Sequence, residues 1–263
     1  MPTLIQEWLS ECSETRRKWW RAIVSFVDAT CFPVHCTLCG TAAGPLPLCV
    51  ECREKITAGP PLCERCALPV GPYLRTDRGC SECRGRSLGF HRAVALGPYV
   101  GSLRELCLRL KHQPNSWLSY WLGLLLLHRR WGAISAIVDS EVDEVPVVTS
   151  VPSHWLRRVM RRHHDQAEEL GRAVAAILGL RYRPLLRRVK STRRLAELSK
   201  TERKKELDRA FRARGRGMAR RHVLLVDDIL TTGATCGSAA RVLKKAGAKR
   251  VTVLVIARAE GRV

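Results

Sequence analysis

The sequence predicts an α/β protein with a parallel sheet, preceded by a small cysteine-rich module. Strand and helix patterns alternate from about residue 90 onward, which is typical of parallel strands joined by helices. Eight cysteines gather in paired motifs ahead of that region. With 263 residues, 46% of them hydrophobic and 27% charged, the chain can bury a core, which excludes a disordered or collagen-like class. We expect an N-terminal helical segment over 1–30, a double zinc ribbon over 31–88 and an α/β domain over 89–263, the last two with separate cores.

The eight paired cysteines form four Cys-x-x-Cys knuckles: Cys36/Cys39, Cys49/Cys52, Cys63/Cys66 and Cys80/Cys83. A knuckle places two thiolates on one side of a tight turn, so two knuckles supply the four ligands of a closed structural zinc site. Four knuckles therefore predict two structural Zn²⁺ ions. Sequential pairing along the chain is the simplest arrangement, and interleaved pairing stays open. A thioredoxin-type redox pair is disfavoured, because that use needs one motif beside a βαβ unit rather than four in a segment rich in Gly and Pro.

The chain shows no export or membrane signal. Charged residues interrupt every apolar run in 1–20, and the longest strongly apolar stretch, 117–127, has 11 residues where a spanning helix needs roughly 20. We therefore expect a cytoplasmic protein without membrane insertion, whose thiols stay reduced and able to bind zinc. The unpaired cysteines are expected to be buried and inert: Cys12, Cys31, Cys107 and Cys236.

Helices in the second part are marked by their first turns. Ser or Asp followed three residues later by Glu forms a capping box, which predicts helices over 102–112, from Asp165 to a stop at Gly179, and from Ser199 onward. A more apolar helix is expected over 117–130. These helices are long enough to cover a sheet.

Strands are indicated by β-branched, apolar runs. The first covers 145–151, and two more cover 223–226 and 251–257. A helix over 236–246 lies between the last two and stops at Gly247. This closing strand–helix–strand unit is of the parallel type and predicts the sheet.

The most informative segment follows the strand over 223–226. Two carboxylates, Asp227 and Asp228, come directly after it, and Thr231–Thr235 then opens a helix. Hydroxyls and backbone N–H groups at a helix N-terminus bind phosphate, and Gly233 allows the backbone to approach it closely. Carboxylates at the carboxyl end of a parallel strand can accept hydrogen bonds from vicinal ribose hydroxyls. The segment therefore predicts a phosphosugar site, and a Walker loop is excluded because Gly-x-x-x-x-Gly-Lys is absent.

The string VLLVDDILTTGAT resembles the phosphoribosyl-pyrophosphate (PRPP) binding motif of type I phosphoribosyltransferases. With the knuckles ahead of it, the chain resembles the competence-protein F (ComF) family, in which a double zinc ribbon precedes a type I phosphoribosyltransferase-like domain. The resemblance implies that PRPP binds with Mg²⁺ and that the phosphoribosyl group passes to an acceptor the sequence does not identify. It also implies the site residues: Asp227 and Asp228 as catalytic residues on the ribose, Thr231, Thr232, Gly233, Ala234 and Thr235 on the 5′-phosphate, Arg158, Arg161 and Arg162 on the pyrophosphate, and Lys111 as a further candidate.

Further matches and some departures run along the chain. Cys31-Phe32-Pro33, Val151-Pro152 and Ala210-Phe211 stand in family order. The segment Arg162–Gln166 keeps only the first and last residues of the usual Arg-Gly-Phe-Asn-Gln, and Leu195 and Glu206 replace a usual Gln and Asn. Thr231 stands where purine-type enzymes carry a third acid. The departures concern the acceptor side, and no general base is identified on the loop.

The net charge of +22 suggests a second kind of ligand. Residues 151–221 hold 22 Lys or Arg against 7 Asp or Glu, more than one PRPP molecule can neutralise. Aromatic residues are sparse there, so binding of single-stranded DNA would rest on phosphates and tolerate any sequence. An idle basic surface is the alternative reading. Two hypotheses result: a phosphoribosyltransferase, or a non-catalytic nucleic-acid-binding protein of DNA uptake that uses PRPP or a nucleotide only as a regulator.

Overall fold

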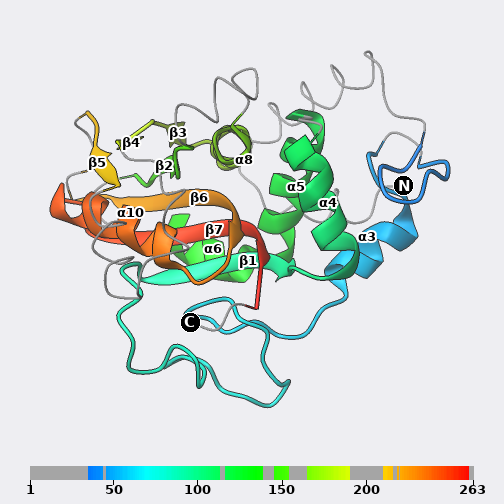
Figure 1. Ribbon diagram of the computed structural model, residues 1–263, viewed down its shortest axis with the longest axis horizontal. Coiled ribbons are helices and arrows are strands. Elements are labelled where there is room, and N and C mark those ends of the chain that lie inside the picture. The colour runs from blue at the N-terminus through cyan, green and yellow to red at the C-terminus, as the bar shows by residue number, and fades with distance from the viewer. Residues whose placement is uncertain are drawn as a thin grey trace.

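A five-stranded sheet of entirely parallel pairs forms the centre of the protein (Figure 1). The computed structural model describes residues 35–43, 46–112, 116–138, 145–153, 165–189, 210–215, 218 and 220–260. The strand order is β1-β7-β6-β2-β3, with bounds Arg92–Pro98 (β1), Arg250–Arg258 (β7), His222–Leu230 (β6), Val147–Ser150 (β2) and Arg181–Tyr182 (β3). The parallel sheet flanked by helices is the predicted fold class.

Helices cover both faces of the sheet. One face packs against α4 (Gly101–His112), α5 (Ser116–Arg129), α6 (Trp131–Val138) and α8 (Gln166–Leu178). The other packs against α10 (Ala234–Lys245) and a short antiparallel hairpin of β4 (Leu186–Arg188) and β5 (Phe211–Ala213). Among the described helices, none is both long and apolar enough to cross a membrane.

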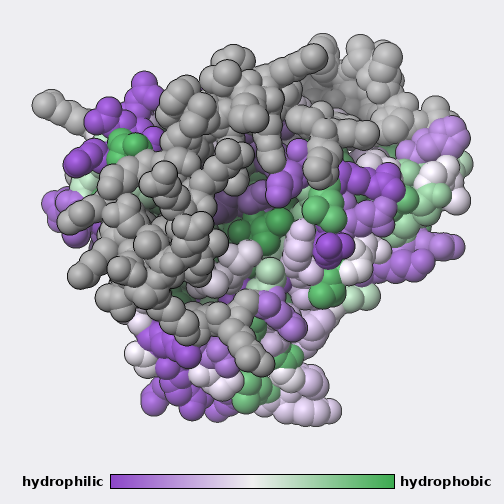
Figure 2. Space-filling model, in the orientation of Figure 1, coloured by the Kyte–Doolittle hydropathy of each residue, from purple (hydrophilic) through white to green (hydrophobic). Residues whose placement is uncertain are grey.

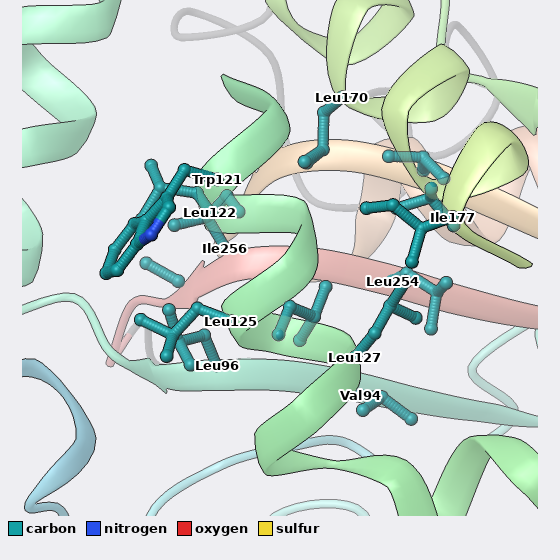
Figure 3. Packing of buried hydrophobic residues seen from close by; sticks show 14 of the residues in the cluster. Val94, Leu96, Trp121, Leu122, Leu125, Leu127, Leu170, Ile177, Leu254 and Ile256 are labelled. Atoms are coloured by element: carbon teal, nitrogen blue, oxygen red, sulfur yellow. The ribbon is translucent and has the colours of Figure 1, made fainter. Parts of the chain in front are cut away.

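Alternation along β6 separates the two halves of the core. Val223 and Leu225 pack with α10, while Leu224 and Val226 pack on the opposite face. Figure 3 shows the larger half, where side chains of α5 and α8 meet those of β1 and β7: Trp121, Leu122, Leu125, Leu127, Leu170, Ile177, Val94, Leu96, Leu254 and Ile256. The same alternation continues beyond Val226 and decides where the next side chains point.

Local signals predicted several elements well. Asp165 is the N-cap of α8 and accepts from the Glu168 backbone N–H, and Gly179 ends that helix in the left-handed conformation (φ 66°). The strand expected over 223–226 continues to Leu230, and the helix expected over 236–246 begins two residues earlier. The strand β1 and the helix α6 were not anticipated. The predicted segments 1–30 and the helix from Ser199 lie outside the described residues.

The cysteine-rich module packs directly on the α/β domain, so the expectation of separate cores is wrong. Its one helix among the described residues, α3 (Val50–Thr57), lies beside α4. Leu48, Cys52 and Ile56 belong to the same hydrophobic cluster as α4 and α5, and Ala67 belongs to the cluster around α10. Spacing patterns indicate metal ligands but carry no information about which surface a ribbon covers.

Candidate functional site

The eight knuckle cysteines form two clusters in sequential order, Cys36/Cys39/Cys49/Cys52 and Cys63/Cys66/Cys80/Cys83. In each, the four Sγ atoms lie within 4.8 Å of one another. The Cys39–Cys49 sulfurs are 3.6 Å apart, and the Cys66–Cys80 sulfurs also 3.6 Å. Tetrahedral zinc with Zn–S bonds of about 2.3 Å sets its sulfurs about 3.8 Å apart, whereas a disulfide needs about 2.05 Å. Both clusters therefore fit structural Zn²⁺, and sequential pairing is confirmed.

The two clusters differ in burial and in neighbours. The first is partly open, since Cys39 is exposed and its thiol contacts the Thr41 hydroxyl at 3.0 Å. It adjoins α4, where Arg109 donates to the backbone oxygens of Thr37 and Leu38. All four cysteines of the second cluster are buried. This cluster lies against the end of the sheet where β6 and β7 finish, through a hydrogen bond from Arg258 to the Cys66 oxygen.

The acidic pair lies at the carboxyl end of β6, beyond the end of its neighbour β2. The last link between these two strands is the Val151 N–H donating to the Val226 oxygen (2.8 Å). Past that point each carboxylate accepts from the next backbone N–H, Asp227 from Asp228 (3.0 Å) and Asp228 from Ile229 (2.8 Å). Within the described residues, no strand pairs with β6 on this side at Asp227 and Asp228, and their role in binding ribose stays a prediction.

Asp227 points toward α10, as its odd position in the strand requires. Its Oδ2 accepts from the Cys236 thiol at 3.3 Å. Burial and the neighbouring Asp228 carboxylate raise the pKa of Asp227 well above its usual value. Burial and the charge of Asp227 likewise raise the pKa of Cys236, so this thiol stays protonated. Cys236 was expected to be an inert core residue, and only the structure shows that it is the hydrogen-bond partner of a site carboxylate.

Asp228 points the other way, into a small cavity between α4, α5, α8 and β7. The cavity is lined by Cys107, Leu110, Ser119, Leu122, Gln166, Leu170, Asp228 and Ile256. The amide nitrogen of Gln166 is buried there without a hydrogen-bond partner in the described part of the chain. Burial and the Asp228 charge raise the pKa of Cys107 to about 12. The two side chains leave the strand in different directions, but their carboxyl groups stay close enough for Asp228 to raise the pKa of Asp227. Cys107 and Gln166, 59 residues apart in sequence, are neighbours that local patterns could not reveal.

The loop after β6 ends in a helix N-terminus that lacks a side-chain cap. Gly233 is the N-cap of α10, with φ 76°, and makes no side-chain hydrogen bond, in contrast to Asp165 at the start of α8. Thr231 and Thr232 are exposed, and the Thr232 hydroxyl accepts from the Ala234 N–H at 3.3 Å. First-turn N–H groups have no acceptor within their own helix, and the helix dipole is positive at this end. The loop Thr231–Thr235 therefore precedes a helix end whose dipole favours an anion, and its role in binding phosphate stays a prediction.

Arg158, Arg161 and Arg162 lie outside the described residues, but both ends of their segment are placed. Ser153 donates its N–H (3.1 Å) and hydroxyl (2.7 Å) to Oδ2 of Asp165. This link closes the segment over 154–164 where β2 ends and α8 begins, at the same end of the sheet as Asp227. Lys111 is exposed near the end of α4, and no contact joins it to the acidic pair within the described residues.

The segment that leaves the second ribbon presses against the first turn of α10. A Cβ on Gly237 would lie 2.4 Å from the Leu88 oxygen, and one on Gly89 would lie 2.4 Å from the Gly237 oxygen. Neither backbone can yield without moving the other, so these two glycines permit the contact. The approach fixes the N-terminal end of α10, which follows the loop Thr231–Thr235.

Gly237→Ala is expected to destabilise the protein by roughly 1–3 kcal/mol, because the methyl group collides with a backbone oxygen. Denaturant unfolding monitored by circular dichroism measures the change. Gly132→Ala in α6 is the matched control, since a Cβ there meets open space; it should be neutral or slightly stabilising. Equal stability of the two variants would show that the Leu88 contact does not constrain α10.

Comparison with known proteins finds a matching family for the cysteine-rich module and another for the α/β domain. A phosphoribosyl transferase domain family matches residues 165–262, and a double zinc ribbon domain family matches residues 28–84. The DNA utilization protein YhgH of Salmonella typhi is 30% identical over 230 residues, covering 84% of this chain and 96% of that protein. Competence protein F of Haemophilus influenzae is 28% identical over 216 residues, covering 81% and 90%. YhgH of Escherichia coli K12 is 29% identical over 229 residues, covering 86% and 97%.

The fold and the site define a protein class in which a double zinc ribbon is joined to a phosphoribosyltransferase domain. Similarity to the relatives extends through both parts and over most of each chain. The chain belongs to the ComF family.

Proposed function

We propose that the protein binds Mg²⁺–PRPP at the carboxyl end of β6 and transfers its phosphoribosyl group. The observation that carries the proposal is the junction of an acidic pair, which lies past the end of β2, with the first turn of α10, whose N-cap is Gly233. Ribose hydroxyls would donate to Asp227 and Asp228, and the 5′-phosphate would accept from the N–H groups of Thr231–Thr235. The carboxylate oxygens suit Mg²⁺, which binds oxygen ligands and substrate phosphates.

In the transfer, the bond between the ribose anomeric carbon and the pyrophosphate oxygen breaks, and pyrophosphate leaves with the electron pair. The acceptor supplies the electron pair of the new bond and loses a proton to solvent, because the loop holds Thr231 where an acid would serve as base. Positive charge develops on the sugar ring, so the two carboxylates nearby stabilise it. Arg158, Arg161 and Arg162 are proposed to receive the pyrophosphate, since both ends of their segment lie at this end of the sheet.

Release of pyrophosphate tests the transfer. The purified protein is incubated with PRPP and Mg²⁺, with and without each of a panel of nucleobases, and pyrophosphate is measured against a no-protein control. Release that depends on one acceptor would support the enzyme. PRPP binding without release for any acceptor would favour PRPP as a regulator.

The second candidate function is binding of single-stranded DNA, and a basic surface at the amino end of the sheet favours it. Three segments meet there: the Arg220 N–H donates to Gly247 (2.8 Å), Lys249 to Arg221 (2.9 Å) and His91 to Val251 (2.8 Å). They carry His91, Arg92, Arg220, Arg221, His222, Lys244, Lys245, Lys249 and Arg250, and these stretches contain no acid. Figure 2 shows hydrophilic residues at the left margin of the molecule, where α10 ends in Figure 1.

The pKa values of the two histidines on this surface are lowered by burial and by its positive charge. Burial and the neighbouring positive charges of His91, Arg250 and Arg92 lower the pKa of His222 to about 4. Burial and Arg250, Arg92 and Lys244 also lower the pKa of His91. A phosphate chain laid across the surface would offset the positive potential. The relatives named for DNA utilization and competence make DNA the nucleic acid to test.

The logarithm of the affinity for a labelled single-stranded oligonucleotide should fall linearly with the logarithm of the salt concentration. The slope should be about 0.7 for each phosphate contact. Lys249→Glu with Arg250→Glu should flatten the slope by about 1.4 and leave PRPP binding intact. Arg75→Glu with Arg78→Glu in the second ribbon is the matched charge reversal and should keep the wild-type slope. Four acids in residues 139–144, outside the described residues, precede β2 in the chain, and their neutralisation should not weaken binding. Absence of binding at about 50 mM salt, or loss only in the ribbon variant, would contradict this assignment.

A further inference from the structure

Arg258, the last residue of β7, is a buried cation at the junction of three segments. The residue is 2% exposed, although it carries a full positive charge. Its Nε donates to the Cys66 oxygen at 3.0 Å, within the second cysteine cluster. Its Nη1 donates to the Leu230 oxygen at 3.1 Å and to the oxygens of Thr231 and Ala259. One side chain therefore joins the second ribbon, the chain after β7 and the first residue of the loop Thr231–Thr235, called the phosphate loop below.

The guanidinium has no carboxylate partner among the described residues, and its acceptors there are all backbone oxygens. A buried charge is costly unless another charge compensates it. Zinc held by four thiolates has a formal charge of minus two, and Cys66, a ligand of the second cluster, is in direct contact with Arg258 through its oxygen. The metal centre therefore supplies the negative charge that the side chain lacks.

Other contacts tie the same ribbon to the same loop. Phe90, which follows the second ribbon in the chain, would lie 3.6 Å from a Cβ on Gly233, the N-cap of α10. Ala67 of the ribbon shares a buried cluster with Leu230 and Cys236. The Arg65 oxygen accepts from the Ala93 N–H of β1 at 3.1 Å. By contrast, the contacts of the first cluster described above run to α4 and α5.

We propose that Arg258 is a positioning residue that couples the second zinc site to the phosphate loop, so that the second zinc, and not the first, sets the geometry of Thr231–Thr235. The effect on PRPP rests on the proposed function, whereas the effect on the loop does not. Arg258 touches two backbone oxygens at the start of the loop, Leu230 and Thr231, and holds them against the ribbon. Removal of the guanidinium leaves the Thr231 oxygen without this donor and the Leu230 oxygen with the Ala259 N–H as donor. Removal of the second metal leaves the guanidinium without its compensating charge.

The test compares Arg258→Met with Arg258→Lys and with Arg130→Met. Arg130 is the matched control, because it also donates to strand oxygens, Ala95 at 2.9 Å and Leu96 at 3.2 Å, but contacts neither the loop nor Cys66. Amide hydrogen exchange of the ligand-free protein is followed at Gly237 and Ala259, whose N–H groups donate to Gly233 (2.7 Å) and Leu230 (2.9 Å). The Leu180 amide at the end of α8 serves as an internal reference.

Arg258→Met should speed exchange at Gly237 and Ala259 by about tenfold or more relative to Leu180, since local opening is no longer opposed by these hydrogen bonds. Arg258→Lys should fall between this variant and wild type, and Arg130→Met should match wild type. In protein loaded with ¹¹³Cd, Arg258→Met should shift the resonance of the second site and leave that of the first, assigned with Cys39→Ser. PRPP affinity should fall by about tenfold in Arg258→Met.

A second route to the same effect avoids the side chain itself. Cys80→Ser removes a ligand of the second site and should loosen Gly237 and Ala259 as Arg258→Met does, whereas Cys39→Ser in the first site should not. If Arg258→Met does not fold, the exchange rates in Arg258→Lys and Cys80→Ser test the coupling instead. Wild-type exchange at these amides in either variant, or equal loosening by Arg130→Met, would overturn the coupling. If wild-type protein does not bind PRPP but the amides respond, the proposed function fails and the coupling stands.

Discussion

Replacement of both Asp227 and Asp228 with Ala is expected to remove PRPP binding almost completely while the protein stays folded. Each charge-assisted hydrogen bond is worth about 1.5–3 kcal/mol, so the loss of two corresponds to a roughly 10²- to 10⁴-fold fall in affinity. Isothermal titration with PRPP and Mg²⁺ measures it. Asp77→Ala in the second ribbon is the control, since this acid is exposed and is not part of the acidic pair.

The raised pKa of Asp227 adds a signature that a folding defect would not produce. In the proposed complex, ribose hydroxyls donate to the ionised carboxylate, so protonation of Asp227 would compete with PRPP. Affinity should therefore rise as the pH increases through the raised pKa and fall as the pH decreases. Asp227→Asn should lose that part of the pH dependence and keep the part due to the ligand's own phosphates. Burial of the carboxylate is unfavourable, so Asp227→Ala should melt no lower than wild type. Unchanged affinity in the double variant would contradict the site assignment.

Removal of zinc is expected to have the largest effect on stability. Structural zinc contributes about 10–16 kcal/mol of apparent free energy in small zinc-binding peptides, comparable to the whole stability of a domain. Protein purified without added metal should contain two zinc ions per chain by elemental analysis. Chelation should lower the melting temperature by about 10 °C or more. A zinc content near zero, with all eight knuckle thiols freely titratable, would contradict both sites.

Loss of the first zinc alone should change side-chain packing in the α/β domain. Cys52 lies in the same cluster as Trp121, which is 5% exposed on α5. Cys39→Ser should therefore lose one zinc and change the near-ultraviolet circular dichroism to which the buried Trp121 contributes. Two independent melting transitions, with the tryptophan signal following only the second, would instead indicate that the ribbon folds apart from the domain.

Local sequence signals predicted the features that depend on nearby residues. The Asp165 cap, the Gly179 stop and the Cys-x-x-Cys knuckles act within a few residues, and the acidic pair follows the buried apolar run 223–226 within β6. The segments β3, β4 and β5 are two or three residues long and leave no periodic pattern. The strand β1 holds an apolar run of only four residues, 93–96, with a single β-branched residue, whereas each of the predicted strands holds more than one.

The residues that sequence reasoning missed act across long distances in the chain. Arg258 contacts Cys66, which precedes it by 192 residues, and a buried arginine at the end of a strand runs against the usual exposure of that residue type. Gly89 and Gly237 matter because two backbones approach each other. Cys107 and Gln166 meet beside Asp228 only after α4 and α8 pack on the sheet. Each depends on tertiary packing, which spacing does not encode.

A crystal structure with PRPP and Mg²⁺ tests the central claim most directly. The account predicts the 5′-phosphate on the first turn of α10, against the N–H groups of Thr231–Thr235, with the ribose hydroxyls within hydrogen-bond distance of Asp227 and Asp228. The space facing the anomeric carbon would then define the shape of the acceptor. PRPP bound instead on the basic amino end of the sheet, or an empty loop at saturating PRPP, would contradict it.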